Sequence, residues 1–244
     1  MRVLAFDVGT KTLSYCLLEF VPGIPATADA PPPPPALTVH AWETTNIHEE
    51  VCAKTKPTMK DDSEYMIQVL SARVEKLFAL CPDAIMIEQQ PAGGHNMFSS
   101  VRMKCLSHVI HGFFYTYQLQ NGGVAPVPVG FVSPSSKLVG MDTQESSADT
   151  KARQAGDRKA MGAKYRKNKR HAVDMTTALL DTLVEGELAD AARATFRAAA
   201  PKQDDVSDAF MLAYAYAKNQ TQKAAPKKKR VAKKRKAAEQ TVDV

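Results

Sequence analysis

Two apolar runs of this chain each end in a carboxylate, and this feature strongly constrains the fold. Residues 2–7 read RVLAFD and residues 84–88 read AIMIE, so Asp7 and Glu88 each close a segment with the composition of a buried strand. A carboxylate in that position is costly unless a cation or hydrogen bonds offset its desolvation. Both segments therefore need a cation or hydrogen bonds at the strand end.

A third segment carries acids on one side of a predicted helix. The stretch DDVSDAFMLAYAYA, residues 204–217, places Asp205 and Asp208 three positions apart and so on one helix face. Three separate segments each bear the cost of desolvating a carboxylate, which indicates that their acids share one site. Its oxygen ligands suit Mg²⁺, with Mn²⁺ as a substitute, and no His or Cys set competes for zinc. Two such ions are the usual arrangement for hydrolysis of a phosphodiester, one activating water and one stabilising the leaving oxygen.

Each acid also has an ordinary structural explanation. An Asp before a Gly-Thr turn is usually a turn residue, which fits Asp7. Acids at a helix start are usually caps, which fits Asp205 and Asp208. Glu88 could mark a strand leaving the core. For any one segment the structural explanation is the stronger, and only the combination favours a metal site.

The order of predicted elements indicates an α/β domain with a mixed sheet. Strands are expected over 2–7, 12–20, 37–43, 84–88 and 124–132, the last interrupted by prolines and so placed toward an edge. Helical spacing predicts helices from about 62, from 99 to 119, over 171–183 and from 204.

Three segments fall outside this pattern. A proline-rich insertion occupies about 21–36, and a basic loop at about 141–170 is expected to be flexible. Residues 219–244 are expected to form a disordered basic tail, so the folded domain spans 1–218. Nine basic residues lie between Lys223 and Lys236, which leaves 23 basic against 26 acidic residues elsewhere. Basic runs bind phosphate backbones, although many are only solvated tails.

Composition limits the compartment. No apolar stretch approaches the roughly 20 residues needed to span a bilayer, and the acid within MRVLAFD argues against a signal peptide. The four cysteines are scattered without zinc-site spacing, so an intracellular, reduced protein is expected, with no membrane partner.

Four segments together resemble the RuvC-type Holliday junction resolvases, nearest to the branch of poxviruses and other large DNA viruses, with relatives in fungal mitochondria. The segments are VLAFDVGTKTLSYCLLE, MIEQQPAGGHNMFSSVRMKCLSHVIHGFF, YRKNKRHAVDMTTALL and DDVSDAFMLAYAY. The resemblance implies a ribonuclease H-like fold with a five-stranded sheet flanked by helices. It also implies a homodimer that resolves four-way DNA junctions by paired symmetric nicks during viral recombination or replication.

The resemblance also implies roles for individual residues. Asp7, Glu88, Asp205 and Asp208 match the family's four metal-binding acids, and Asp204 is an extra acid beside them. Lys137 resembles a lysine near the scissile phosphate, although an exposed loop lysine is as good an explanation. Contacts to the DNA backbone are expected from a set of polar and basic residues: Gln89, Gln90, Arg102, Lys104, Lys164, Arg166, Lys167, Lys169 and Arg170.

The tail PKKKRVAKKRK, residues 226–236, resembles a nuclear localisation signal for an import receptor, or else a DNA-binding or solubilising extension. The tail predicts that the protein is located in the host nucleus or at the viral replication site of an infected cell.

Three other functions compete with the one that this resemblance implies. FDVGTKT also resembles the first phosphate loop of sugar kinases and actin, but the chain is too short for their two lobes. A nuclease of the same fold could act on other branched DNA or an RNA–DNA hybrid. A junction-binding protein that does not cut is disfavoured because all four acids are present.

Overall fold

The computed structural model describes residues 1–9, 11–25, 33–47, 58–90, 97–121, 126–137 and 158–224. The strands are β1 Arg2–Val8, β2 Thr12–Val21, β3 Ala36–Asn46, β4 Ala84–Glu88 and β5 Val129–Val132. The helices are α2 Met59–Ser71, α3 Val74–Ala79, α4 Met97–Gln120, α6 Arg158–Leu180, α7 Glu187–Ala198 and α8 Gln203–Ala224, with the short 3₁₀ turn η1 Pro134–Lys137. No described helix combines the length and hydropathy that crossing a membrane requires.

The five strands form one mixed sheet in the order β3-β2-β1-β4-β5. β1, β2 and β3 pair antiparallel, whereas β4 runs parallel to β1 and β5 runs parallel to β4. The expected five-stranded mixed sheet is therefore confirmed. β5 is an edge strand, as its prolines predict, but it covers only Val129–Val132, because Pro126 and Pro128 lack the amide hydrogens that a longer ladder needs.

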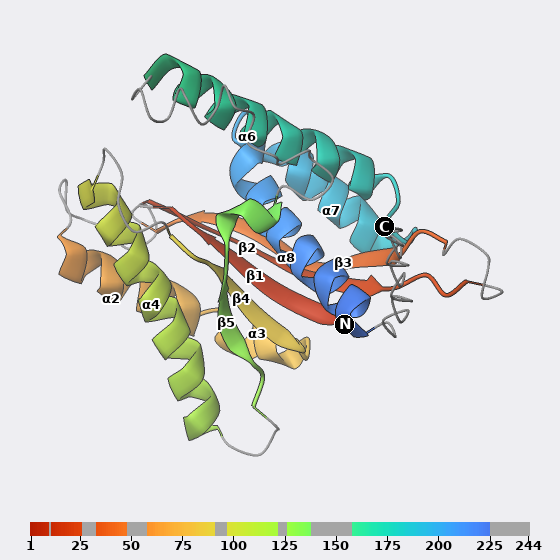
Figure 1. The fold of residues 1–244 in the computed structure, drawn as a ribbon. Helices are drawn as coiled ribbons and strands as arrows, with labels where there is room; N and C mark the ends of the chain where they lie inside the picture. Colours follow the sequence, from red (N-terminus) through yellow and green to blue (C-terminus); the bar gives the residue numbers. More distant parts are fainter. Residues whose placement is uncertain are drawn as a thin grey trace, which may run out of the picture.

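Helices cover both faces of the sheet (Figure 1). Along β1, Val3 and Ala5 pack with α6, α7 and α8, while Leu4 and Phe6 pack with α2, α3 and α4. Because successive strand residues point to opposite faces, Asp7 belongs to the face of Val3 and Ala5. The carboxylate at the end of β1 therefore points toward the side that α8 covers.

Trp42 of β3 anchors the helices on that side. Its ring stacks on Phe196 of α7 at 5.8 Å and lies 5.2 Å from Phe210 of α8. Its indole Nε1 donates a hydrogen bond to the carbonyl of Val206 at 3.0 Å. This contact places the start of α8, with its acids, against the sheet.

Two boundaries differ from the sequence predictions. α6 begins at Arg158, so the second half of the segment expected as a flexible loop is helical. Its Lys, Arg and Ala residues favour helix without needing a buried face. α8 continues to Ala224, past the expected end of the folded domain at 218, and residues 225–244 of the predicted tail lie outside the described residues. The described parts of the proline-rich insertion, 22–25 and 33–35, contain no helix or strand, and 141–157 lie outside the description.

Candidate active site

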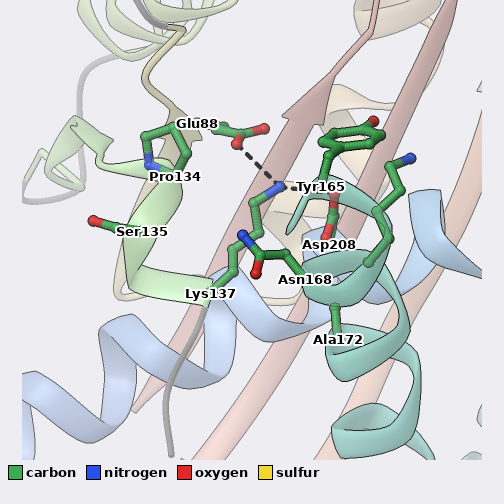
Figure 2. A pocket seen from close by; sticks show the side chains of 9 residues that line it. Glu88, Pro134, Ser135, Lys137, Tyr165, Asn168, Ala172 and Asp208 are labelled. Atoms are coloured by element: carbon green, nitrogen blue, oxygen red, sulfur yellow. Dashed lines mark ion pairs between the residues drawn. The ribbon is translucent and has the colours of Figure 1, made fainter. Parts of the chain in front are cut away.

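The side chain of Lys137 lies where three acids meet. Its Nζ is 3.1 Å from Asp7 Oδ1, 3.0 Å from Glu88 Oε1 and 3.0 Å from Asp208 Oδ2. Figure 2 shows the Lys137 ammonium between the carboxyl groups of Glu88 and Asp208. Only 8% of the lysine side chain is exposed, and all three acids are largely buried. The structure thus brings together three of the four predicted acids and the predicted lysine.

Four separate elements supply these side chains. Asp7 lies near the end of β1, and Glu88 ends the parallel neighbour β4, whose alternation puts Glu88 on the same face as Ala84 and Met86 of the α8-side core. Lys137 ends η1, which follows β5 and contacts α8. Asp208 lies in the second turn of α8. The site therefore stands at the carboxyl ends of the parallel strands.

The turn after β1 is tightly packed beneath the site. The amide of Gly9 donates to the carbonyl of Thr12 at 2.9 Å. A Cβ at position 9 would lie 2.6 Å from Thr12 Oγ1, which leaves no room for a larger residue. The turn after Asp7 therefore depends on glycine.

Three acids share one cation, and the pKa values of two of these acids are raised as a result of burial and mutual repulsion. Burial, together with a hydrogen bond and the charge from Asp7, raises the pKa of Glu88 to about 9. Burial raises the pKa of Asp208 to about 6 against the opposing effect of Lys137. For Asp7 burial is outweighed by the Lys137 ammonium and the Glu88 hydrogen bond, which hold its pKa below the ordinary value. The cluster has capacity for more positive charge than Lys137 provides.

Asp205, the fourth predicted acid, faces a second lysine. Lys169 of α6 pairs with Asp204, and its Nζ is 3.8 Å from Asp205 Oδ1. Burial and the neighbouring Asp204 raise the pKa of Asp205. Asp204, expected only to support the site, is the closer partner of Lys169. The charge of Asp7 contributes further to raising the pKa of Asp205.

The chemistry of this donor set fits a divalent cation. Three carboxylate oxygens already surround one cationic atom, and hard oxygen ligands are what Mg²⁺ and Mn²⁺ prefer. Their distances from Lys137 Nζ exceed the roughly 2.0–2.1 Å of Mg²⁺–oxygen bonds. Among the described residues, no group of three or more His, Cys, Asp or Glu side chains is placed so that it could hold a metal ion as it stands. Metal binding would require the acids to close in and the lysine to withdraw.

The two glutamines after Glu88 have different environments. Gln89 is exposed and free to meet a ligand from solvent. Gln90 is buried, and its Nε2 donates to the carbonyl of Val8 at 3.2 Å. In this structure the Gln90 amide holds the ends of β1 and β4 together, and its contact with the DNA backbone stays a prediction.

Arg102 forms an ion pair within the protein. Its Nε pairs with Asp62, whose side chain is fully buried, and the ion pair joins α4 to α2. The Arg102 side chain is 16% exposed, and its contact with the DNA backbone stays a prediction. Lys104, two residues further along α4, is exposed and remains a candidate for contact with DNA.

The basic residues of α6 keep their predicted place on the surface. Arg166, Lys167 and Arg170 are exposed, whereas Lys169 turns toward the acids. The side chain of Lys164 lies outside the description, so its contact with DNA stays a prediction.

A cavity of about 330 Å³ opens beside the acids. Its walls are η1 and α6, and its lining includes Glu88, Lys137 and Asp208. Sequence reasoning missed two of the lining residues, Tyr165 and Asn168. The signal was available in YRKNKR, where an aromatic and an amide side chain interrupt a basic run.

Comparison with protein families gives one match over nearly the whole chain. Residues 3–243 match the family described as mitochondrial resolvase Ydc2 / RNA splicing MRS1. The chain belongs to this family. The family description names a mitochondrial resolvase, which agrees with the fungal mitochondrial relatives that the resemblance of the four segments implied.

A solved structure shows the same fold. The yeast mitochondrial Holliday junction resolvase Ydc2 is similar with a TM-score of 0.55 and 19% identity, covering 91% of this chain and 81% of that one. RuvC of T. thermophilus in complex with a Holliday junction substrate gives a TM-score of 0.49 and 14% identity, covering 91% and 96%. No curated protein matches the sequence. The expected ribonuclease H-like fold is confirmed.

Proposed function

We propose that this chain is a divalent-metal-dependent endonuclease that resolves four-way DNA junctions. The observation that carries the proposal is the convergence of Asp7, Glu88 and Asp208 on one cationic position at the end of the sheet. Membership in a family described by a mitochondrial resolvase supports the substrate class.

The chain's own residues prepare the site for metal. Asp7, Glu88 and Asp208 would hold it, with Asp205 beside them. Bound Mg²⁺ or Mn²⁺, two ions per site, would supply activation of water and neutralisation of charge on the phosphate. Lys137 balances the charge of the acids in this structure. With a metal bound to the acids, its ammonium would be available to pair with the phosphate being cut. Exposed Lys104, Arg166 and other α6 residues would grip the DNA backbone.

Symmetric resolution requires two such sites. We propose a homodimer in which each subunit nicks one strand, because a four-way junction has two equivalent cutting positions related by a two-fold axis.

A second candidate is a nucleic-acid-binding protein that does not cut. The family description itself includes RNA splicing, so members need not all be resolvases. The buried acid cluster favours cutting, since a binding surface has no need of three carboxyls facing away from bulk solvent.

The deciding experiment compares a synthetic four-way junction with linear duplex, flap and RNA–DNA hybrid substrates, in Mg²⁺ and with chelator. We expect symmetric nicks in the junction that disappear with chelator. Asp7→Asn is expected to lose cutting by about 10³-fold or more while binding the junction normally, because binding depends on the basic surface. Cutting at the parent rate by Asp7→Asn would overturn the site.

Two other outcomes would change the proposed function. Preferential cutting of flap or hybrid would keep the acids and change the substrate. Tight binding of junctions or RNA without cutting in Mg²⁺ or Mn²⁺ would establish the binding function instead.

We further propose that the protein acts for a large DNA virus in an infected cell, with the basic segment 226–236 directing it to the nucleus through an import receptor. Fusion of this segment to a fluorescent protein tests the second part. Uniform distribution of the fusion through the cell would exclude an import signal.

A further inference from the structure

The cavity beside the acids has the parts of a nucleotide subsite. Its volume of about 330 Å³ is at the small end of ligand pockets. Glu88, Lys137 and Asp208 line one part, while Tyr165, Asn168 and Lys169 of α6 line another. A phosphate at the acids would therefore place its own nucleotide against α6.

Tyr165 offers a flat apolar surface at this position. It is 60% exposed although it lines the cavity, and one face of its ring lies 5.3 Å from Lys169 Nζ. A cation–π contact at an exposed site stabilises little, so packing on Lys169 does not explain why a large ring is left in solvent. Aromatic rings beside basic residues are the usual platforms for unstacked bases.

Asn168 offers the polar complement. In Figure 2 its amide extends from α6 between Tyr165 and η1, toward the side where Lys137 lies. Within the described residues the amide makes no hydrogen bond, so one acceptor and two donors remain for a ligand. An asparagine amide matches a base edge that presents a donor next to an acceptor, as adenine does.

We infer that Tyr165 and Asn168 form a subsite for the nucleotide beside the scissile phosphate, with Tyr165 stacking on its base and Asn168 reading its edge. This inference rests on the proposed nuclease function and extends it to sequence preference at the cut. Lys169, between the ring and Asp204, supplies the positive charge for the adjoining phosphate.

The first test is single-turnover cutting of four junctions that differ only in the base beside the cut. Tyr165→Ala should cut about 10- to 100-fold more slowly than the parent, the usual effect of removing a stacking ring. Tyr165→Phe keeps the ring and should stay within about two-fold. Asn168→Ala should cut all four junctions at similar rates, whereas the parent prefers one base by about five-fold or more.

Tyr115 provides the matched control. It is 58% exposed on α4, which packs on the other face of the sheet, so Tyr115→Ala removes an equally exposed ring far from the acids. Its cutting rate and base preference should equal those of the parent. Thermal unfolding of every variant confirms that the fold is retained.

The decisive substrate is a junction with an abasic residue beside the cut. If Tyr165 acts by stacking, the parent should cut this junction as slowly as Tyr165→Ala cuts the normal one, and Tyr165→Ala should lose nothing more. The subsite would be overturned if Tyr165→Ala were slower than the parent by the same factor on the normal and the abasic junction. It would also be overturned if Tyr165→Ala and Asn168→Ala kept the cutting rates and base preference of the parent.

Failure of the proposed function is distinguishable from failure of the subsite. If the parent cuts flap or hybrid DNA instead of junctions, the junction proposal falls, and the same variants with an abasic flap or hybrid still decide the subsite. If the parent binds junctions without cutting, the loss of affinity in Tyr165→Ala on normal but not abasic junctions decides it.

Discussion

At the scale of single residues, the ammonium of Lys137 is shared by three buried carboxyl groups, two more than it can neutralise. Despite burial, the charges of Asp7, Glu88 and Asp208 raise the pKa of Lys137, so it stays charged. In the absence of metal it is the cation that allows these acids to lie together.

Replacement of Lys137 by Met should therefore destabilise the metal-free protein. Removing one partner of a buried charge cluster costs about 3–5 kcal/mol in the free energy of unfolding. Mg²⁺ should recover much of this loss, so its stabilising effect should be larger in Lys137→Met than in the parent. Denaturant unfolding in chelator and in Mg²⁺ measures both.

Lys60→Met is the control, since this lysine is exposed and pairs with Glu64 away from the acids. A similar response of both variants to Mg²⁺ would contradict the special position of Lys137.

Glu43 gives a pH-dependent prediction away from the site. It accepts hydrogen bonds from Arg73 Nη2 and Tyr15 OH, both at 2.6 Å, and from Thr45 at 2.8 Å. Burial opposes ionisation, but these hydrogen bonds prevail and lower the pKa of Glu43 to about 2. Because the folded pKa lies below the ordinary 4.5, the extra stability is complete above about pH 4.5 and is lost as pH falls toward 2.

Glu43→Gln should consequently reduce the free energy of unfolding at pH 7 by about 1 kcal/mol, a value discounted because 41% of the side chain is exposed. The difference from the parent should shrink between pH 4.5 and 2. Glu64→Gln, in an exposed pair with Lys60, is the control and should change little at any pH. A difference from the parent that is constant with pH would refute the role of the Glu43 charge.

At the scale of elements, the Arg102–Asp62 pair joins α4 to α2 and so holds the helices of one sheet face together. Arg102→Met leaves Asp62 buried without this partner and should cost about 3 kcal/mol of stability or more. DNA affinity at a temperature where the variant is folded should stay near that of the parent.

Lys104→Met on the same helix is the matched comparison. It should leave stability unchanged, weaken DNA binding, and lower the slope of log affinity against log salt by about 1, as expected for one lost phosphate contact. Unfolding curves and fluorescence anisotropy at several salt concentrations test both variants. If Arg102→Met weakened DNA binding without loss of stability, while Lys104→Met did not weaken DNA binding, Arg102 would be a DNA contact after all.

At the scale of the whole molecule, paired nicking predicts a homodimer. Sedimentation of the full chain should give about twice the mass of one subunit at micromolar concentration. A plasmid with an extruded cruciform should be linearised directly, because both nicks then fall within the lifetime of one complex. A monomer that yields only nicked circles would exclude paired resolution.

The sequence by itself determined the five-stranded sheet and the acids at the strand ends. These features depend on local patterns, since side-chain alternation and the cost of burying Asp7 or Glu88 can be read within a few residues. The start of α6 was missed because a polar helix has no apolar period to reveal it.

Only the tertiary structure decided which cations meet which acids. Lys137 reaches Asp7 across 130 positions of sequence, and Arg102 reaches Asp62 across 40. Neighbouring polar residues look alike in the sequence, and burial alone separates Gln90 from Gln89 or Arg102 from Lys104. Such pairings depend on how α4, α6 and α8 pack on the sheet, which no local pattern of residues contains.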